Sequence, residues 1–572
     1  MNSENTAQNK TAEQFDAVVI GAGIGGLTAA AMLCKAGLKV CVLEMDVRPG
    51  GYLAGFKRKD FRFDSAIHWL NQCGPKGSVT RAFELLGNDF PKAKAQQRIK
   101  RYKGNAYDYL LTNKPDEWKK ELIRDFPHEE KGLHKFFAAA KKIGKSFDNA
   151  NDFFRSPESM TIFGKALTSL RKLKFALPFM RYIRYSGPGG LTKGLNTFFK
   201  DPKLHAVFCS EPDLLSCLVP IGWAYYNDYQ FPPVGGSQVF PEWLSYVIQQ
   251  TGGEIRFRSK VIGVDVKNGR CKGLTVQHRN REYYIASDII LAACDMDTLY
   301  NKMLPQDAVS GKMKAALEKA ELYSSSVTLS IALDCPVEDL GFTEEMIFLC
   351  DETLSRDKYS NGDPKTSGIS ILPPSLRDPS LVPKGKGTLT IYVPAFFDHN
   401  EHWKTEQRAD GSLMRGEAYK AFKKEFAEVL IKRVEDSLAP ELSKHIEYFD
   451  VATPITHWRY TGNKNGTIMG ARPGKENMMA GVAHYRTPVK GLYMSGHWAE
   501  LGGGVPIAVK GGVNSAIIAL KDAGHRAYKV YADYFDGKIK KDAAWSSPVL
   551  KQYDNSWKQN LTPAEKKAEV GV

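Results

Sequence analysis

A glycine-rich turn close to the N-terminus constrains the fold of this chain more than any other feature. An apolar strand, Ala17-Val18-Val19-Ile20, leads directly into Gly21-Ala22-Gly23-Ile24-Gly25-Gly26, and an apolar helix follows over residues 27–36. A second strand over residues 39–43 completes a β-α-β unit of about 30 residues. Because the pattern G-x-G-x-x-G stands between a strand and a helix, it predicts a Rossmann-like α/β unit that binds a dinucleotide.

Each glycine of this turn has a physical role. Gly21 allows the tight turn, Gly23 lets a diphosphate approach the backbone amides of the helix, and Gly26 lets helix and strand pack closely, with Gly25 beside it. Glu44 follows 18 residues after Gly26, where its carboxylate can accept hydrogen bonds from ribose hydroxyls. The alternative is a tight turn that holds no ligand, and Glu44 argues against it.

The residues after Glu44 indicate which dinucleotide binds. In Arg48-Pro49-Gly50-Gly51, two adjacent glycines (Gly50 and Gly51) let the backbone run against a cofactor, and Arg48 supplies charge beside it. This R-x-G-G pattern resembles the extended FAD fingerprint of the amine-oxidase and carotenoid-desaturase superfamily. No second G-x-G-x-x-G follows a strand, so the sequence predicts no separate NAD(P)H domain.

The resemblance continues from about Asp16 to about Ala532. Phe63-Asp64-Ser65-Ala66-Ile67 resembles a stretch of phytoene desaturases, and His68-Trp69 is closer to retinol saturases. Phe231-Pro232-Pro233-Val234-Gly235-Gly236 resembles the entry into the second FAD segment, and Gly502-Gly503-Gly504-Val505-Pro506 resembles the turn that meets the flavin. The resemblance implies cofactor contacts at Val261, Gly496, Val505 and Pro506.

Two histidines are candidates for catalysis. His497 occupies the flavin-proximal turn; at His497-Trp498 many members of the resembled family carry Gly-Asp, and that aspartate binds the cofactor. His68 is placed to transfer a proton beside the flavin, since imidazole titrates near neutrality. For His68, a hydrogen-bonded structural histidine is the alternative.

The strand and helix patterns predict two interleaved domains. A discontinuous Rossmann-like FAD-binding domain takes residues 15–74, 235–300 and 454–535. An α+β substrate domain takes residues 75–234 and 301–453. The polar ends, residues 1–14 and 540–572, are predicted to be mobile tails. The fold class is therefore α/β.

The positive charge of the chain is concentrated in one segment. The net charge is +15, and residues 159–200 hold eight basic side chains and no acid. Apolar residues in this segment recur at steps of three and four, which predicts an amphipathic helix lying on an anionic membrane; they are Phe163, Leu167, Leu170, Leu173, Leu177 and Met180. The alternative is a surface helix whose apolar face covers a core, and Pro178 argues against a helix across that position. No nucleic-acid recognition module accompanies the charge.

The remaining composition bears on location and metals. The N-terminus lacks an apolar signal segment, and no apolar run approaches the roughly 18 residues of a spanning helix. We therefore expect a cytoplasmic protein attached peripherally to a membrane. The nine cysteines are scattered without a C-x-x-C pair, which predicts free thiols in a reducing compartment and no metal site.

Aromatic residues precede the second FAD segment. Trp223 and Tyr226, together with Trp69, are predicted to wall a tunnel for an apolar substrate, and core packing is the equal alternative. The family resemblance implies an FAD-dependent oxidoreductase that exchanges hydride between flavin N5 and a lipophilic polyene or isoprenoid. Desaturation, saturation and isomerisation use the same site, and the His68-Trp69 likeness favours the last two. The electron donor or acceptor stays open.

Two other functions share this architecture. A flavin amine oxidase would take hydride from an amine carbon, and the basic, apolar segment argues against a small cationic substrate. A non-catalytic lipid or prenyl-protein carrier of the GDP-dissociation-inhibitor type would not use flavin. The intact set of glycines with Glu44 argues against such a carrier.

Overall fold

A parallel sheet assembled from three distant segments forms the centre of one half of the molecule. The computed structural model describes residues 13–67, 69–186, 189–209, 211–354, 356–409 and 412–557. The sheet has the strand order β10-β3-β2-β14-β22, and all neighbours pair in parallel. Its strands are β2 (Ala17–Ile20), β3 (Val40–Leu43), β10 (Glu254–Arg256), β14 (Ile290–Ala292) and β22 (Leu492–Met494). This sheet confirms the Rossmann-like α/β fold class.

Two helices meet over this sheet through glycines. Helix α1 (Ile24–Lys35) packs against α18 (Val505–Asp522) and α9 (Val239–Gln250). A Cβ atom on Gly25 would stand 2.5 Å from the Cα atom of Gly496 and 2.7 Å from the carbonyl oxygen of Ala508. Only glycine lets the backbones approach this closely, so the turn also fixes how α1 and α18 pack. A second, four-stranded sheet flanks the unit; it contains β1 (Glu13–Gln14), β11 (Ser259–Lys267), β12 (Arg270–His278) and β13 (Arg281–Ala286).

The other half is built on a seven-stranded sheet with the order β21-β15-β18-β17-β16-β7-β8. All neighbours are antiparallel except β16 and β7. Helix α15 (Glu417–Ser437) shares its core. The strands are β7 (Arg98–Lys103), β8 (Asp108–Thr112), β15 (Ser325–Leu333), β16 (Met346–Leu349), β17 (Ile369–Leu372), β18 (Gly387–Ala395) and β21 (Ile446–Ala452).

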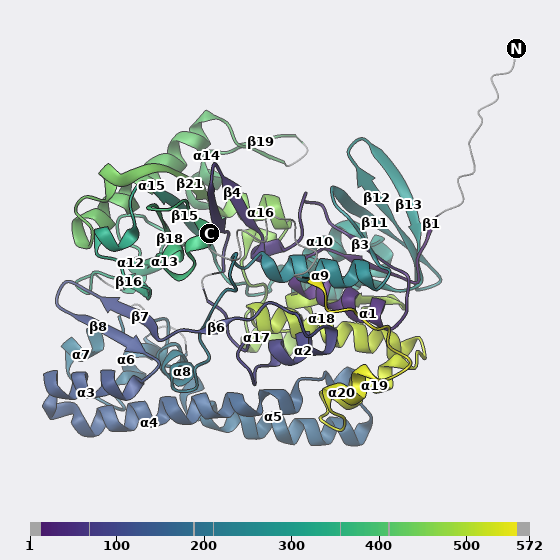
Figure 1. Cartoon of the computed structure of the whole chain (residues 1–572), viewed down its shortest axis with the longest axis horizontal. Coiled ribbons are helices and arrows are strands. Elements are labelled where there is room, and N and C mark those ends of the chain that lie inside the picture. The colour runs from purple at the N-terminus through teal and green to yellow at the C-terminus, as the bar shows by residue number, and fades with distance from the viewer. Residues whose placement is uncertain are drawn as a thin grey trace, which may run out of the picture.

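A helical layer lies below this sheet in Figure 1 and has its own aromatic core. It contains α3 (Pro115–Asp125), α4 (Glu130–Ser146), α7 (Pro202–Ala206) and α8 (Leu214–Tyr225). Helix α5 (Ile162–Ile183) runs along the lower edge of the molecule toward the FAD-binding half (Figure 1). The expected interruption at Pro178 does not occur, because Tyr182 in the last turn is buried against Phe198.

Both predicted tails are partly ordered. Residues 13 and 14 pair with β13 (Arg281–Ala286), and residues 1–12 lie outside the described residues. Helix α20 (Lys541–Trp545) and the segment after it pack on the core: Trp545 donates to the carbonyl of Glu84, and the Tyr553 hydroxyl donates to Asp89 over 2.7 Å. The structure thus corrects the prediction of a mobile tail for residues 540–557, because these aromatic side chains bury apolar surface. Residues 558–572 lie outside the described residues.

No helix among the described residues is both long and apolar enough to span a membrane.

Candidate flavin and substrate site

One cavity of about 1010 Å³ opens where the strands of the parallel sheet end. Its volume lies at the upper end of the usual range for ligand sites, roughly 300–1,000 Å³. Ile20 and Leu43, the last residues of β2 and β3, line it. This is the position where open α/β sheets bind ligands. The predicted residues that line it are Gly21, Gly23, Gly25, Gly26, Glu44, Gly50, Gly51, Trp69, Trp223, Val261, Gly496, His497, Val505 and Pro506.

The glycine turn has the shape that a dinucleotide requires. A Cβ atom on Gly23 would have no atom within 4 Å, so the backbone at this position faces open space at the start of α1. A Cβ atom on Gly26 would stand 2.1 Å from the carbonyl oxygen of Gly21. Gly23 therefore leaves room for a ligand, and Gly26 permits the turn itself. A diphosphate at this turn would face the positive end of the α1 dipole.

Glu44 is held at the edge of the cavity by the backbone. One carboxylate oxygen accepts from the amide of Ala22 over 2.7 Å, and the other accepts from the amide of Asp46 over 2.8 Å. Burial raises the pKa of this carboxyl, and the two amide hydrogen bonds oppose that shift. Each oxygen keeps a second lone pair for a ribose hydroxyl.

The flavin-proximal turn places a buried imidazole at the wall of the cavity. Nε2 of His497 is buried without a hydrogen-bond partner among the described residues, and the ring packs 5.2 Å from that of Trp498. Burial lowers the pKa of His497 to about 4, so the ring is neutral at pH 7. Helix α18 begins beside it at Val505, with Pro506 in its first turn. The positive end of the helix dipole favours a ring that gains negative charge, and a neutral imidazole can donate or accept a hydrogen bond. Together they suit a polar, electron-accepting ring at this edge of the cavity.

Aromatic side chains wall the part of the cavity away from the glycine turn. Trp69, Phe147 and Trp223 line it, and the rings of Phe147 and Trp223 lie 5.7 Å apart. The ring of Tyr229 packs against both tryptophans. Its centroid lies 6.3 Å from that of Trp69 and 5.8 Å from that of Trp223. The arrangement offers an apolar surface to a substrate that extends away from the cofactor.

Two predicted site residues are not in the lining, and a third lies outside the described residues. The Arg48 guanidinium donates to the carbonyl oxygen of Gly55, so the residue braces the turn after Gly50 and Gly51. Tyr226 lies outside the residues that line the cavity, although its neighbour Trp223 belongs to them. His68 lies outside the described residues.

Asp228 also lines the cavity, although no sequence pattern singled it out. Its carboxylate accepts from the backbone amide of Gln72 over 2.6 Å and from the Gln72 side chain over 2.7 Å. Burial raises the pKa of Asp228 to about 6, so this group can hold or release a proton near neutrality. The available signal was a single acid inside an aromatic run that leads into the second FAD segment.

The chain matches a family of known cofactor. The family model described as flavin containing amine oxidoreductase matches residues 24–518. The chain belongs to this family. It is an FAD-dependent oxidoreductase, which confirms the predicted cofactor and enzyme class and leaves the non-catalytic carrier without support. The glycine turn, Glu44 and the α18 N-terminus are the groups that fit FAD.

Curated relatives of similar length match almost the whole chain. Prolycopene isomerase from Daucus carota is 27% identical over 537 residues, covering 92% of this chain and 83% of the relative. All-trans-retinol 13,14-reductase from Danio rerio is 24% identical over 542 residues, covering 85% and 83%. These relatives confirm the predicted branch of the superfamily.

Two solved structures show the same fold. An oxidoreductase from Methanosarcina mazei aligns with a TM-score of 0.53 at 16% identity, covering 87% of this chain and 98% of the other. Cyclohexylamine oxidase from Brevibacterium oxydans aligns with a TM-score of 0.52 at 13% identity, covering 89% and 99%.

Proposed function

We propose that this enzyme exchanges hydride between FAD and a carbon–carbon bond of a lipophilic polyene or isoprenoid, which it takes from an anionic membrane. FAD supplies the two-electron chemistry when bound. The chain binds the diphosphate at Gly21–Gly26, the ribose at Glu44 and the ring beside His497 and Val505. Isomerisation and saturation are the favoured outcomes, because the relatives named for polyene reactions are a prolycopene isomerase and a retinol 13,14-reductase.

The observation that carries the substrate proposal is a line of aromatic rings from the cavity to helix α5. Phe147 lines the cavity beside Trp223. The Phe147 ring also lies 5.5 Å from Phe175 and 5.9 Å from Phe179, both on α5. A polyene in the cavity would meet apolar surface at Phe147 and Trp223, and Phe147 links that wall to α5.

The outer side of α5 supports docking on a membrane. Its apolar side chains point to solvent, with exposed fractions from 41% at Leu167 to 88% at Ile162. A helix that covered a core would bury them, so the exposure argues against that alternative. Basic residues without any acid flank the face, which suits an anionic lipid surface. The exposed apolar residues are Ile162, Phe163, Leu167, Leu170, Leu173, Leu177, Met180 and Ile183.

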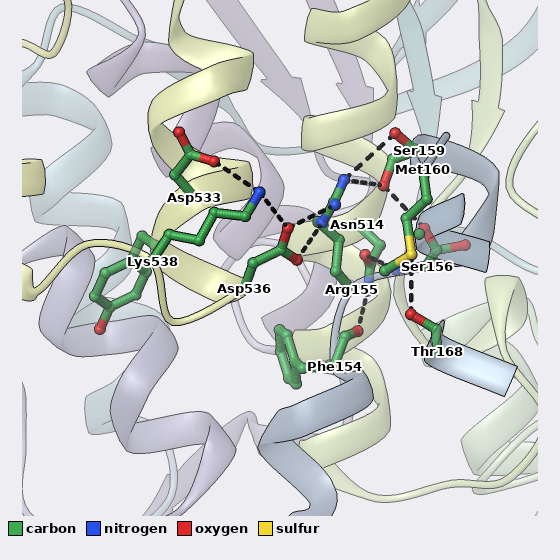
Figure 2. A network of polar contacts seen from close by, with 12 residues as sticks. Phe154, Arg155, Ser156, Ser159, Met160, Thr168, Asn514, Asp533, Asp536 and Lys538 are labelled. Atoms are coloured by element: carbon green, nitrogen blue, oxygen red, sulfur yellow. Dashed lines mark hydrogen bonds and ion pairs between the residues drawn. The ribbon is translucent and has the colours of Figure 1, made fainter. Parts of the chain in front are cut away.

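The start of α5 is fixed to the FAD-binding half by a polar network (Figure 2). Arg155 forms a two-pronged ion pair with Asp536, with both nitrogen–oxygen distances 2.8 Å, and also donates to Ser159. Asn514 of α18 donates to the carbonyl of Phe154 and accepts from the amide of Ser156. The helix is therefore held at a fixed position relative to the flavin site, which a docking element requires.

The reaction is tested by anaerobic incubation of FAD-loaded protein, oxidised or reduced, with prolycopene or all-trans-retinol in detergent. We expect an unchanged mass with a new retention time for isomerisation, or a gain of two hydrogens for saturation. Phe147→Leu should lower turnover without loss of bound FAD. Phe90→Leu, in an aromatic cluster with Phe83 and Trp243, is the matched control. Absence of turnover by the wild type, together with peroxide release from putrescine or cyclohexylamine, would favour an amine oxidase.

A further inference from the structure

Two cysteines from distant segments meet at the junction of the helical layer and the seven-stranded sheet. Cys209 lies shortly after α7, and Cys350 directly follows β16. Their Sγ atoms are 3.3 Å apart, although 141 positions separate them in the chain. Both are free thiols. A disulfide has a sulfur–sulfur distance of about 2.05 Å, so the two sulfur atoms need to approach by only about 1.3 Å.

The surroundings give the two thiols different properties. Cys209 is half-buried, and the Tyr107 hydroxyl lies 3.6 Å from its sulfur. Hydrogen bonds from Cys350 and then from Tyr107 lower the pKa of the Cys209 thiol, against the effect of burial. Cys350 is only 3% exposed, and its hydrogen bond to Cys209 and its burial raise the pKa of its thiol. Cys209 is therefore the thiol that ionises first and that a small oxidant reaches.

We propose that Cys209 and Cys350 are a redox site that forms a reversible disulfide when the protein meets a hydroperoxide. The Cys209 thiolate attacks one oxygen of the peroxide, the O–O bond breaks, and Cys209 becomes a sulfenic acid while an alcohol or water leaves. The Cys350 thiol then attacks that sulfur, the S–O bond breaks, and water leaves. The two thiols lose two electrons in total, and the peroxide gains them.

The position of the pair gives this bond a structural consequence. The amide of Cys350 donates to the carbonyl of Lys103 over 2.9 Å, so Cys350 is tied to β7 as well as to β16. Cys209 leads into α8, the helix that carries the cavity residue Trp223. The disulfide would therefore join the helical layer to the parallel pair of strands in the sheet. This inference does not depend on the identity of the substrate.

The test uses the full-length, FAD-loaded protein treated with hydrogen peroxide, alkylated, and digested without reductant. We expect a linked peptide containing Cys209 and Cys350, a loss of two titratable thiols per chain, and full recovery with dithiothreitol. Cys335 is also half-buried, so Cys335→Ser is the control and should form the linked peptide at the wild-type rate. Cys209 should react with peroxide at least tenfold faster than Cys335 in the wild type.

Two variants separate the steps. Cys350→Ala should stop at a sulfenic acid on Cys209, which dimedone traps, and Cys209→Ser should abolish both products. Because substitution of the buried Cys350 risks the fold, the wild-type linked peptide alone decides the assignment. The proposal is overturned if Cys209 and Cys350 both stay alkylatable after Cys335 is oxidised, or if Cys209 pairs only with another chain.

Discussion

The sharpest test of the membrane proposal replaces three leucines on the outer face of α5 by serine. Leu170, Leu173 and Leu177 are 65%, 51% and 59% exposed. Complete burial of a leucine side chain contributes about 2 kcal/mol, so burial of these exposed portions in lipid contributes about 3.5 kcal/mol in total. The triple variant should therefore bind vesicles with a partition coefficient about 300-fold lower than that of the wild type. If the leucines insert to only half that depth, the partition coefficient should be about 20-fold lower.

The assay is flotation with vesicles of phosphatidylcholine and phosphatidylglycerol, together with urea unfolding of the same variant. The leucines face solvent, so the free energy of unfolding should change by less than about 0.5 kcal/mol. A core leucine would instead cost about 2–5 kcal/mol on truncation.

The control is the double variant Phe396→Ser with Met414→Ser, whose side chains are 42% and 37% exposed. Phe396 lies next to α14 (His399–Lys404), and Met414 lies in β20 (Leu413–Met414), which forms a hairpin with β19 (Glu406–Gln407). Helix α14 and this hairpin are at the opposite edge of Figure 1 from α5.

Three results would refute this reasoning. If the triple variant floats as well as the wild type, the exposed face does not insert into lipid. If it unfolds at much lower urea concentration, the leucines belong to a packed interface. A wild-type dimer that becomes monomeric in the triple variant would show that a second copy of the chain covers the face.

Three further predictions concern the fold. Gly26→Ala should destabilise the protein by about 3 kcal/mol or more and prevent FAD uptake, because the new Cβ atom meets backbone at 2.1 Å; Gly311→Ala, with open space around it, should leave the urea midpoint and the flavin absorbance unchanged. Burial lowers the pKa of His457 to about 4, so the unfolded chain binds the proton more readily and stability falls as the pH drops from about 6.5 toward 4. Between pH 7 and 5 the loss is about 2 kcal/mol, and His457→Gln should remove that part of the slope in urea titrations; an unchanged slope would assign it elsewhere. Arg155→Ala should cost about 1–3 kcal/mol in unfolding free energy, because it removes two charge-assisted hydrogen bonds and leaves Asp536 with the exposed Lys538 as its ion-pair partner. Arg155→Met with Asp536→Leu should recover most of that loss; a double variant no more stable than the single one would contradict this account.

The FAD-binding half was predictable because its signals are local. Strands β2 and β3 are apolar runs buried on both faces, as parallel strands are, and the glycine turn between β2 and α1 fixes the unit. The association of three distant segments into one domain was predicted because all three segments carry strands of the same pattern. The order of the strands in the sheet was not predicted, because periodicity specifies strands without naming their neighbours.

The orientation of α5 was not predictable from its pattern. Its inner side carries Phe175, Phe179 and Tyr182, and its outer side carries a row of leucines, so apolar residues occupy both faces. Periodicity identifies a face and does not say whether that face meets a core or the surroundings. The roles of Asp228 and of the Cys209–Cys350 pair were not predicted for a related reason, because their contact partners lie far away in the sequence.

The distribution of charge is compatible with an α5 that is fixed to the enzyme and, as proposed, docks on anionic lipid. The acids that hold its start are neutralised locally: Glu158 accepts from the amides of Tyr485 and Arg486 and lies 3.6 Å from the Arg486 guanidinium, while Asp536 pairs with Arg155. Because these carboxylates are already compensated, they do little to repel an anionic leaflet. The long basic side chains of α5 can extend their charges toward headgroups while their stems lie along apolar surface. In the proposed docking, the basic residues of α5 supply the charge that meets the leaflet, and the fixed start of the helix keeps Phe175 and Phe179 against Phe147 at the cavity wall.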